Sequence, residues 1–164
     1  MKTLIKISLI SALIILVSFC SCKTQRQATS SAKKIEFNVV NNNTNSSYKT
    51  AQEIKINSVD ELNVVWVELF NKYDRKPPIP AFDFEKQMLI AVTAGEKTNG
   101  GSTIKVGSVV ETSKSVIITI EEGKPGEGCM TTSVMSYPFE LIELEKVDKE
   151  VVFKRVSTTY DCNQ

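Results

Sequence analysis

The sequence contains no histidine among its 164 residues. Histidine is the side chain whose ordinary pKa lies nearest neutral pH, and it is the commonest neutral metal ligand. Its absence argues against most hydrolytic and zinc-dependent chemistry. The 20 Lys and Arg residues balance the 19 Asp and Glu residues, so the chain also lacks the strong positive charge that nucleic-acid binding requires. We therefore expect a protein that does not bind nucleic acid.

Long hydrophobic runs are also scarce. The one marked run extends from Leu9 to Phe19 and follows Lys2 and Lys6. It is shorter than the roughly 20 residues that a membrane-spanning helix needs. A positively charged start followed by a short apolar core is typical of a secretory signal peptide, so we predict that the protein is exported.

The end of this run predicts lipidation at Cys22. Small Ser21 precedes Cys22, as in the signal of bacterial lipoproteins. Residues 1–21 would be removed, and acyl chains on Cys22 would anchor the protein to a membrane of the bacterial cell envelope, facing the periplasm or the cell exterior. One alternative is cleavage before Cys20, which would place bulky Phe19 at the cleavage position. The other is ordinary cleavage that leaves two free thiols.

Two cysteines remain after this processing, Cys129 and Cys162. An exported protein reaches a compartment that permits disulfides. A bond between them would close a loop of about 34 residues and stabilise the fold by roughly 3 to 4 kcal/mol. The alternative is two reduced cysteines, because Cys162 lies close to the C-terminus.

The mature chain divides into a polar tether and one domain. We expect residues 22–52 to be a tether that contains one weak strand, over residues 35–40, and residues 53–164 to form a single domain. Within it, residues 54–57 resemble a strand. Ser58 and Glu61 then form a capping-box pattern that begins a helix. Its apolar positions have helical spacing and predict one buried face: Val59, Leu62, Val65, Trp66, Leu69, Phe70 and Tyr73.

The second half of the domain reads as a series of strands. Buried or alternating patterns cover residues 88–94, 104–110, 116–120, 137–144 and 151–156, separated by turn-forming segments. Such a series favours an antiparallel β-meander. One amphipathic helix packed on this sheet makes the predicted fold class α+β.

No pattern in the sequence predicts a catalytic, metal or cofactor site. Ser133, Ser136 and Cys129 lack a suitably spaced base. The carboxylates near residues 121–127 lack the spacing of a calcium loop, and the glycines of residues 123–128 lack the phosphate-loop pattern. We expect no enzyme activity, no metal and no cofactor.

Three blocks between residues 82 and 144 carry a family resemblance. They are AFDFEKQMLIAVTAGEK, TNGGSTIKV and GKPGEGCMTTSVMSYPFELI. Their order resembles the C-terminal domain of the PrcB family, accessory lipoproteins of secreted bacterial protease complexes. The resemblance implies a non-enzymatic protein that binds and stabilises a partner protein, which in this family is a secreted or surface protease complex. In this family an aromatic residue often follows the paired glycines, and this chain has Ser102 at that position.

Two glycine-rich segments are the predicted partner-binding sites, residues 97–102 and 123–130. Glycine lets a backbone approach a partner closely, although it also serves turn geometry alone. The candidate residues are Lys97, Thr98, Asn99, Gly100, Gly101, Lys124 and Glu127. Alternative functions are a free-standing envelope domain with a structural or small-ligand role, and a protease inhibitor that uses the loop GKPGEG.

The lipid anchor is tested by the substitution Cys22→Ser. We expect the variant to leave the membrane fraction or to remain there as unprocessed precursor, because the modified side chain is lost. Fractionation and labelling with radioactive palmitate measure this outcome. A variant that is still labelled and processed would contradict the assignment.

Overall fold

The computed structural model describes residues 32–162. The predicted signal peptide and Cys22 lie outside the described residues. In chain order the elements are β1 (Lys33–Ile35), β2 (Phe37–Asn43), β3 (Ala51–Ile56), α2 (Val59–Phe70), β4 (Gln87–Ala94), β5 (Thr103–Glu111), β6 (Ser115–Pro125), β7 (Phe139–Glu145) and β8 (Glu150–Tyr160).

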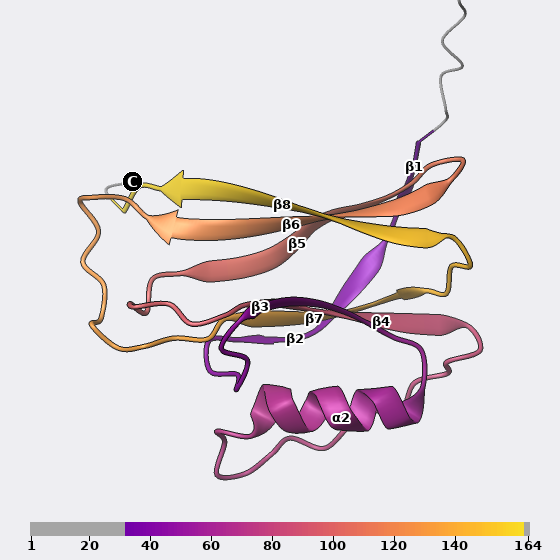
Figure 1. Cartoon of the computed structure of the whole chain (residues 1–164), viewed down its shortest axis with the longest axis horizontal. Coiled ribbons are helices and arrows are strands. Elements are labelled where there is room, and N and C mark those ends of the chain that lie inside the picture. The colour runs from indigo at the N-terminus through magenta and orange to yellow at the C-terminus, as the bar shows by residue number, and fades with distance from the viewer. Residues whose placement is uncertain (1–31, 163–164) are drawn as a thin grey trace, which may run out of the picture.

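The described chain forms three layers (Figure 1). Sheet A has the strand order β1-β5-β6-β8, and sheet B has the order β2-β7-β4-β3. The two sheets face each other, and α2 covers the outer face of sheet B. A mostly antiparallel architecture with one helix confirms the predicted α+β class.

Helix α2 begins where the capping pattern predicts. The Ser58 hydroxyl accepts a hydrogen bond from the Glu61 N–H at 3.2 Å. The Glu61 carboxylate in turn accepts the N–H of Asn57 at 2.7 Å, one residue earlier than in the standard capping box. The first bond satisfies a backbone donor that a helix start leaves free, and the second satisfies the N–H at the end of β3.

The predicted apolar face of α2 packs onto sheet B. Trp66 is only 4% exposed, its ring centroid lies 4.6 Å from that of Phe70, and its indole N–H donates to the Pro77 carbonyl at 3.0 Å. Val59, in the predicted stripe, remains exposed at the first helical position. The buried members are Leu62, Val65, Trp66, Leu69 and Phe70.

Strand β4 is covered on both faces. Met88, Ile90 and Val92 belong to the core between the sheets, whereas Leu89 and Ala91 belong to the core beneath α2. This position explains the continuous apolar sequence of β4, because a strand buried on both sides needs no polar alternation.

The strand order differs from a simple meander. The predicted strands exist, but they divide between two sheets, and β6 pairs with β8 in parallel from Ser115 to Pro125. Residues 126–138 carry the chain from sheet A to sheet B, and residues 146–149 carry it back. Alternation in a sequence indicates that a segment is a strand and not which strand it pairs with.

The folded part begins before the predicted boundary at residue 53. Residues 33–43, placed in the tether by the sequence, form β1 in sheet A and β2 in sheet B. β2 lies at the edge of its sheet and is mostly exposed. An edge strand tolerates polar residues, which is why the asparagines of this segment resembled a linker.

Glu140 is a carboxylate buried between the sheets. It lies in β7, is 4% exposed, and accepts the Val106 N–H of β5 at 2.5 Å. Burial raises the pKa of this carboxyl above its ordinary value, while the Val106 N–H, the Asn42 side chain and the charge of Lys105 oppose the rise. Glu140 therefore links sheet B to a backbone donor of sheet A.

The core role of Trp66 is tested by Trp66→Ala. We expect the free energy of unfolding to fall by about 3 to 5 kcal/mol, because the substitution empties a buried aromatic site. Urea denaturation measures the loss. Val67→Ala, at an exposed neighbouring position of the same helix, is the control, and equal stability of the two variants would contradict the prediction.

Candidate partner-binding surface

Both predicted binding segments lie at one end of the sandwich. The turn of residues 97–102 leaves β4, and residues 126–136 leave β6 at the end where β8 also finishes (Figure 1). We call residues 97–102, residues 126–136 and Tyr160 the loop surface. Tertiary structure thus joins segments that are separated by more than twenty residues in the chain.

Hydrogen bonds fasten the two segments to each other. Lys97 and Ser136 exchange backbone hydrogen bonds of 2.8 and 2.9 Å, and the Gly100 N–H donates to the Thr132 carbonyl at 3.0 Å. The Ser136 hydroxyl donates to the Asn99 carbonyl at 2.6 Å. Irregular loops with this many cross-bonds hold one shape, so their exposed side chains are presented in a defined arrangement.

The C-terminal strand β8 is hydrogen-bonded to the same surface. The Tyr160 hydroxyl donates to the Gly101 carbonyl at 2.5 Å, and the Gly126 N–H donates to the Tyr160 carbonyl at 2.9 Å. Cys129 and Cys162 are joined by a disulfide with their Cα atoms 5.2 Å apart. The end of the chain is therefore bound to the loop that follows β6.

The turn after β4 requires glycine at one position. Gly95 has a φ of +71°, and a Cβ there would lie 2.9 Å from the Ala51 nitrogen and the Thr50 carbonyl carbon. Both the left-handed backbone and the close approach exclude a side chain. Gly95 therefore sets the direction in which residues 97–102 leave the sheet.

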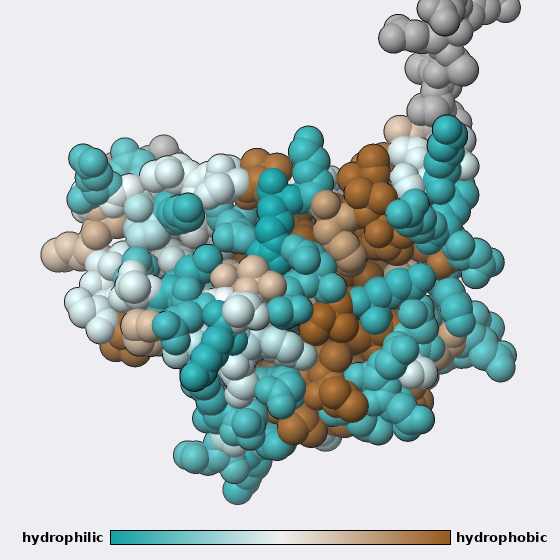
Figure 2. Space-filling view, viewed as in Figure 1, coloured by the Kyte–Doolittle hydropathy of each residue, from teal (hydrophilic) through white to brown (hydrophobic). Residues whose placement is uncertain are grey.

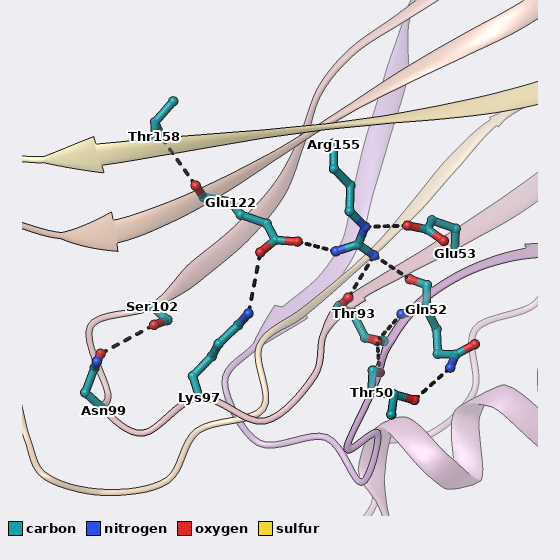
Figure 3. Close-up of polar contacts among 10 residues, drawn as sticks. All are labelled: Thr50, Gln52, Glu53, Thr93, Lys97, Asn99, Ser102, Glu122, Arg155 and Thr158. Carbon is teal, nitrogen blue, oxygen red and sulfur yellow. Dashed lines mark hydrogen bonds and ion pairs between the residues drawn. The ribbon is translucent and has the colours of Figure 1, made fainter.

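A cluster of ion-paired side chains adjoins the loop surface at Lys97 (Figure 3). We call Arg155, Glu122, Glu53 and Lys97 the ion cluster. Arg155 of β8 pairs with Glu122 of β6 and Glu53 of β3. Its guanidinium also donates to the carbonyls of Gln52 and Thr93 at 3.1 and 3.0 Å. Lys97 adds a 3.5 Å ion pair to Glu122. One side chain thus connects an edge of sheet A with two strands of sheet B.

This cluster is partly shielded from water. The side chains of Arg155 and Glu122 are 25% and 16% exposed. Burial acts to lower the pKa of Arg155, but the hydrogen bonds and charges of Glu53 and Glu122 outweigh it and raise that pKa. The guanidinium remains charged, and each of its three nitrogens donates to at least one oxygen, as a charged group away from water requires.

The structure separates the predicted contact residues into two groups. Lys97 turns toward Glu122, and the Asn99 side-chain oxygen accepts the Gly101 N–H at 3.0 Å, so both hold the turn in shape. Thr98, Gly100, Lys124 and Glu127 are exposed, and Gly101 is half-buried. The expectation of a free loop over residues 123–130 needs correction, because residues 123–125 pair with β8 as the end of β6.

The apolar residues of this surface were not predicted from the sequence. Met130 is fully exposed, Val134 is 64% exposed, and Met135 and Tyr160 are also exposed. They occur in a polar segment without periodicity, where apolar residues do not predict a buried face. The run MTTSVM is the sequence signal that could have revealed them. It places three apolar residues in a segment that is too polar to be part of the core.

A groove of about 440 Å³ adjoins these residues. It is lined by residues 43–45, Tyr73, Gly100, Thr132, Val134, Met135 and Ser136. The Tyr73 hydroxyl is buried and has no hydrogen-bond partner within residues 32–162. Burial raises the pKa of Tyr73, so this hydroxyl stays protonated.

Residues 32–162 contain no group of three or more Cys, Asp or Glu residues placed to hold a metal ion. The described helix is too short to cross a bilayer.

Comparison with known families identifies the centre of this fold. Residues 88–145 match the family model described as PrcB C-terminal. This part of the chain is similar to the PrcB C-terminal family. The suspected resemblance over residues 82–144 is therefore confirmed. A search of curated proteins and a search of solved structures each found no match.

The PrcB C-terminal match covers the central strands of both sheets. Residues 88–145 span β4, β5, β6 and β7, which are the two inner strands of sheet A and the two inner strands of sheet B. The edge strands lie outside the match. They are β1 and β8 in sheet A and β2 and β3 in sheet B. The matched segment also contains most of the loop surface.

The ion cluster is tested by Arg155→Met. We expect a loss of about 2 to 3 kcal/mol in the free energy of unfolding, because two carboxylates and two carbonyls lose a charged donor. Chemical denaturation measures this loss. Lys154→Met, at the exposed neighbouring position of β8, is the control. An equal effect of both substitutions would show that the cluster adds nothing to stability.

Proposed function

We propose that this protein is a non-enzymatic lipoprotein of the bacterial envelope that binds and stabilises a partner protein through the loop surface. The partner we propose is a secreted or surface protease complex. Lipidation at Cys22 would hold the domain at the membrane, and residues between Cys22 and β1 would connect the two.

The exposed apolar side chains of the loop surface are the observation that carries the proposal. Met130, Val134 and Met135 are exposed, yet the segment that contains them is fixed by hydrogen bonds and the disulfide. Methionine adapts its shape to a partner, and a held backbone loses little entropy on binding. Gathered apolar residues at the surface of an exported domain favour a protein-binding site.

The groove beside these residues supports the same proposal. A partner side chain entering it would contact Val134 and Met135, which are among the residues that line it. Binding there would cover these two exposed apolar side chains.

The choice of a protease as partner rests on the family. The PrcB C-terminal match includes residues 126–136, and the resemblance implies an accessory subunit of a protease complex. The absence of histidine from the sequence supports a role without catalysis. An inhibitor that inserts the loop GKPGEG is less supported, because its first three residues belong to β6.

The proposal is tested with the triple variant Met130→Gln, Val134→Thr and Met135→Gln. We expect recovery of the partner from crosslinked native envelopes to fall at least about tenfold, as when a few central residues of an interface are lost. The thermal midpoint should stay unchanged, because the three side chains are exposed. Quantitative mass spectrometry of the captured proteins provides the measurement.

The matched control replaces apolar residues that are exposed elsewhere. Val59→Thr with Val67→Thr changes two exposed positions of α2, outside the loop surface. This variant should recover the partner at the wild-type level. Undiminished recovery by the triple variant would contradict the loop surface as the binding site, and recovery of no partner from wild-type envelopes would favour a free-standing domain.

A further inference from the structure

Strand β3 has an open edge. It stands at one end of sheet B and pairs with β4 from Ala51 to Ile56. Its other edge meets no strand within residues 32–162. An open edge presents backbone donors and acceptors that another strand is able to use.

The pairing pattern shows which residues of β3 present these groups. The Ala94 N–H donates to Pro138, on the β7 side of β4. The N–H and C=O groups of successive residues point to opposite edges of a strand. The N–H and C=O of Thr93 therefore point toward β3. Gln52 is the partner of Thr93. The groups of Gln52 therefore face β4, and those of Glu53 and Lys55 face outward.

The open edge has a defined end. The Asn57 N–H also belongs to the outward set, and the Glu61 carboxylate accepts it at 2.7 Å. A further strand would thus pair along residues 51–55 and stop where helix α2 begins.

We propose that a second copy of this chain pairs with β3, antiparallel and about a twofold axis at Ile54. In this register residues 53–55 of the two copies pair, because Ala51 and Gln52 would lie opposite residues 57 and 56, where the open edge has ended. Glu53 lies opposite Lys55 of the second copy, and Lys55 lies opposite Glu53 of the second copy. Both residues have outward backbone groups, so they form hydrogen-bonded pairs. The two B sheets join into one continuous sheet.

Charge favours this self-pairing. Directly opposite residues of unlike charge stabilise a strand pair, and the symmetry creates two such pairs from the sequence Glu53-Ile54-Lys55. Glu53 is held by Arg155. Lys55 is exposed and has no ion pair within the described chain. A like-charged edge would repel its own copy, whereas this edge complements it.

Apolar surface lies beside the same edge. Ile54, Val64 and Val65 line a shallow groove of about 460 Å³ between β3 and α2, and Val64 is 68% exposed. Figure 2 shows apolar side chains gathered across this face of the molecule, which includes β3 and α2. At the axis the two Ile54 residues form a non-hydrogen-bonded pair, in which side chains approach most closely.

An extended segment of another protein would also satisfy an open edge. The observation that favours a second copy is the self-complementary order of Glu53, Ile54 and Lys55. A foreign strand would not need this order. The proposed dimer is independent of the loop surface, because the two surfaces share no residue.

The dimer is tested by disulfide crosslinking of the full chain in its membrane with Ile54→Cys. The two Cα atoms at the axis would lie about 4.5 Å apart, within the range of a disulfide. We expect a covalent dimer on a non-reducing gel after mild oxidation. Gln52→Cys is the control, because its two copies would be offset by four residues, about 14 Å along the strands.

A charge variant provides the second measurement. In the Ile54→Cys background, Lys55→Glu would place two carboxylates opposite each other, and we expect a severalfold loss of crosslinked dimer. Sedimentation of the detergent-solubilised full chain, with and without Lys55→Glu alone, gives the same comparison without an added cysteine. We expect the wild-type chain to be dimeric and the variant to dissociate.

The following outcomes would overturn the proposal. One is a folded Ile54→Cys variant, with a wild-type thermal midpoint, that forms no covalent dimer. Another is equal crosslinking by Gln52→Cys, which would indicate random collision. A covalent adduct with a different protein would assign the edge to a foreign strand. If Ile54→Cys fails to fold, a monomeric wild-type chain in sedimentation overturns the dimer.

Discussion

The ion cluster at Arg155 is the interaction on which the arrangement of the two sheets most depends. The main apolar core between the sheets fixes no single orientation by itself, because apolar packing is not directional. Arg155 of β8 meets Glu122 in its own sheet, and Glu53, Gln52 and Thr93 in the other. Because the guanidinium is planar, it can donate to these oxygens only when they lie in a limited set of positions. Glu140 adds a second polar link, to the Val106 N–H of β5.

The same cluster connects the two surfaces to which we assign binding roles. Through Lys97 and Glu122 it supports the turn of the loop surface, and through Glu53 it holds a side chain of the open β3 edge. The PrcB C-terminal match supplies the inner strands and much of the loop surface. The segments outside the match supply the sheet edges. Partner binding is thus proposed for the family's part of the fold and self-association for an added edge.

Local patterns were sufficient for most elements and for part of the candidate site. Ser58 and Glu61 marked the start of α2, and the spacing of Leu62, Trp66 and Leu69 marked its buried face. The paired glycines correctly located an exposed turn. The role of Lys97 was not predictable, because its partner Glu122 is distant in the chain. Met130 and Val134 were overlooked because exposure depends on which residues pack nearby.

Short-range periodicity, capping and composition were enough to predict the kind of each main element, the absence of histidine chemistry and the expectation of export. Tertiary structure decided the division into two sheets, the inclusion of residues 33–43 and the parallel pairing of β6 with β8. It also decided which side chains of the loop surface remain exposed. The physical reason is that strand pairing and burial depend on residues far apart in the chain, and alternation along one strand carries no information about its neighbour.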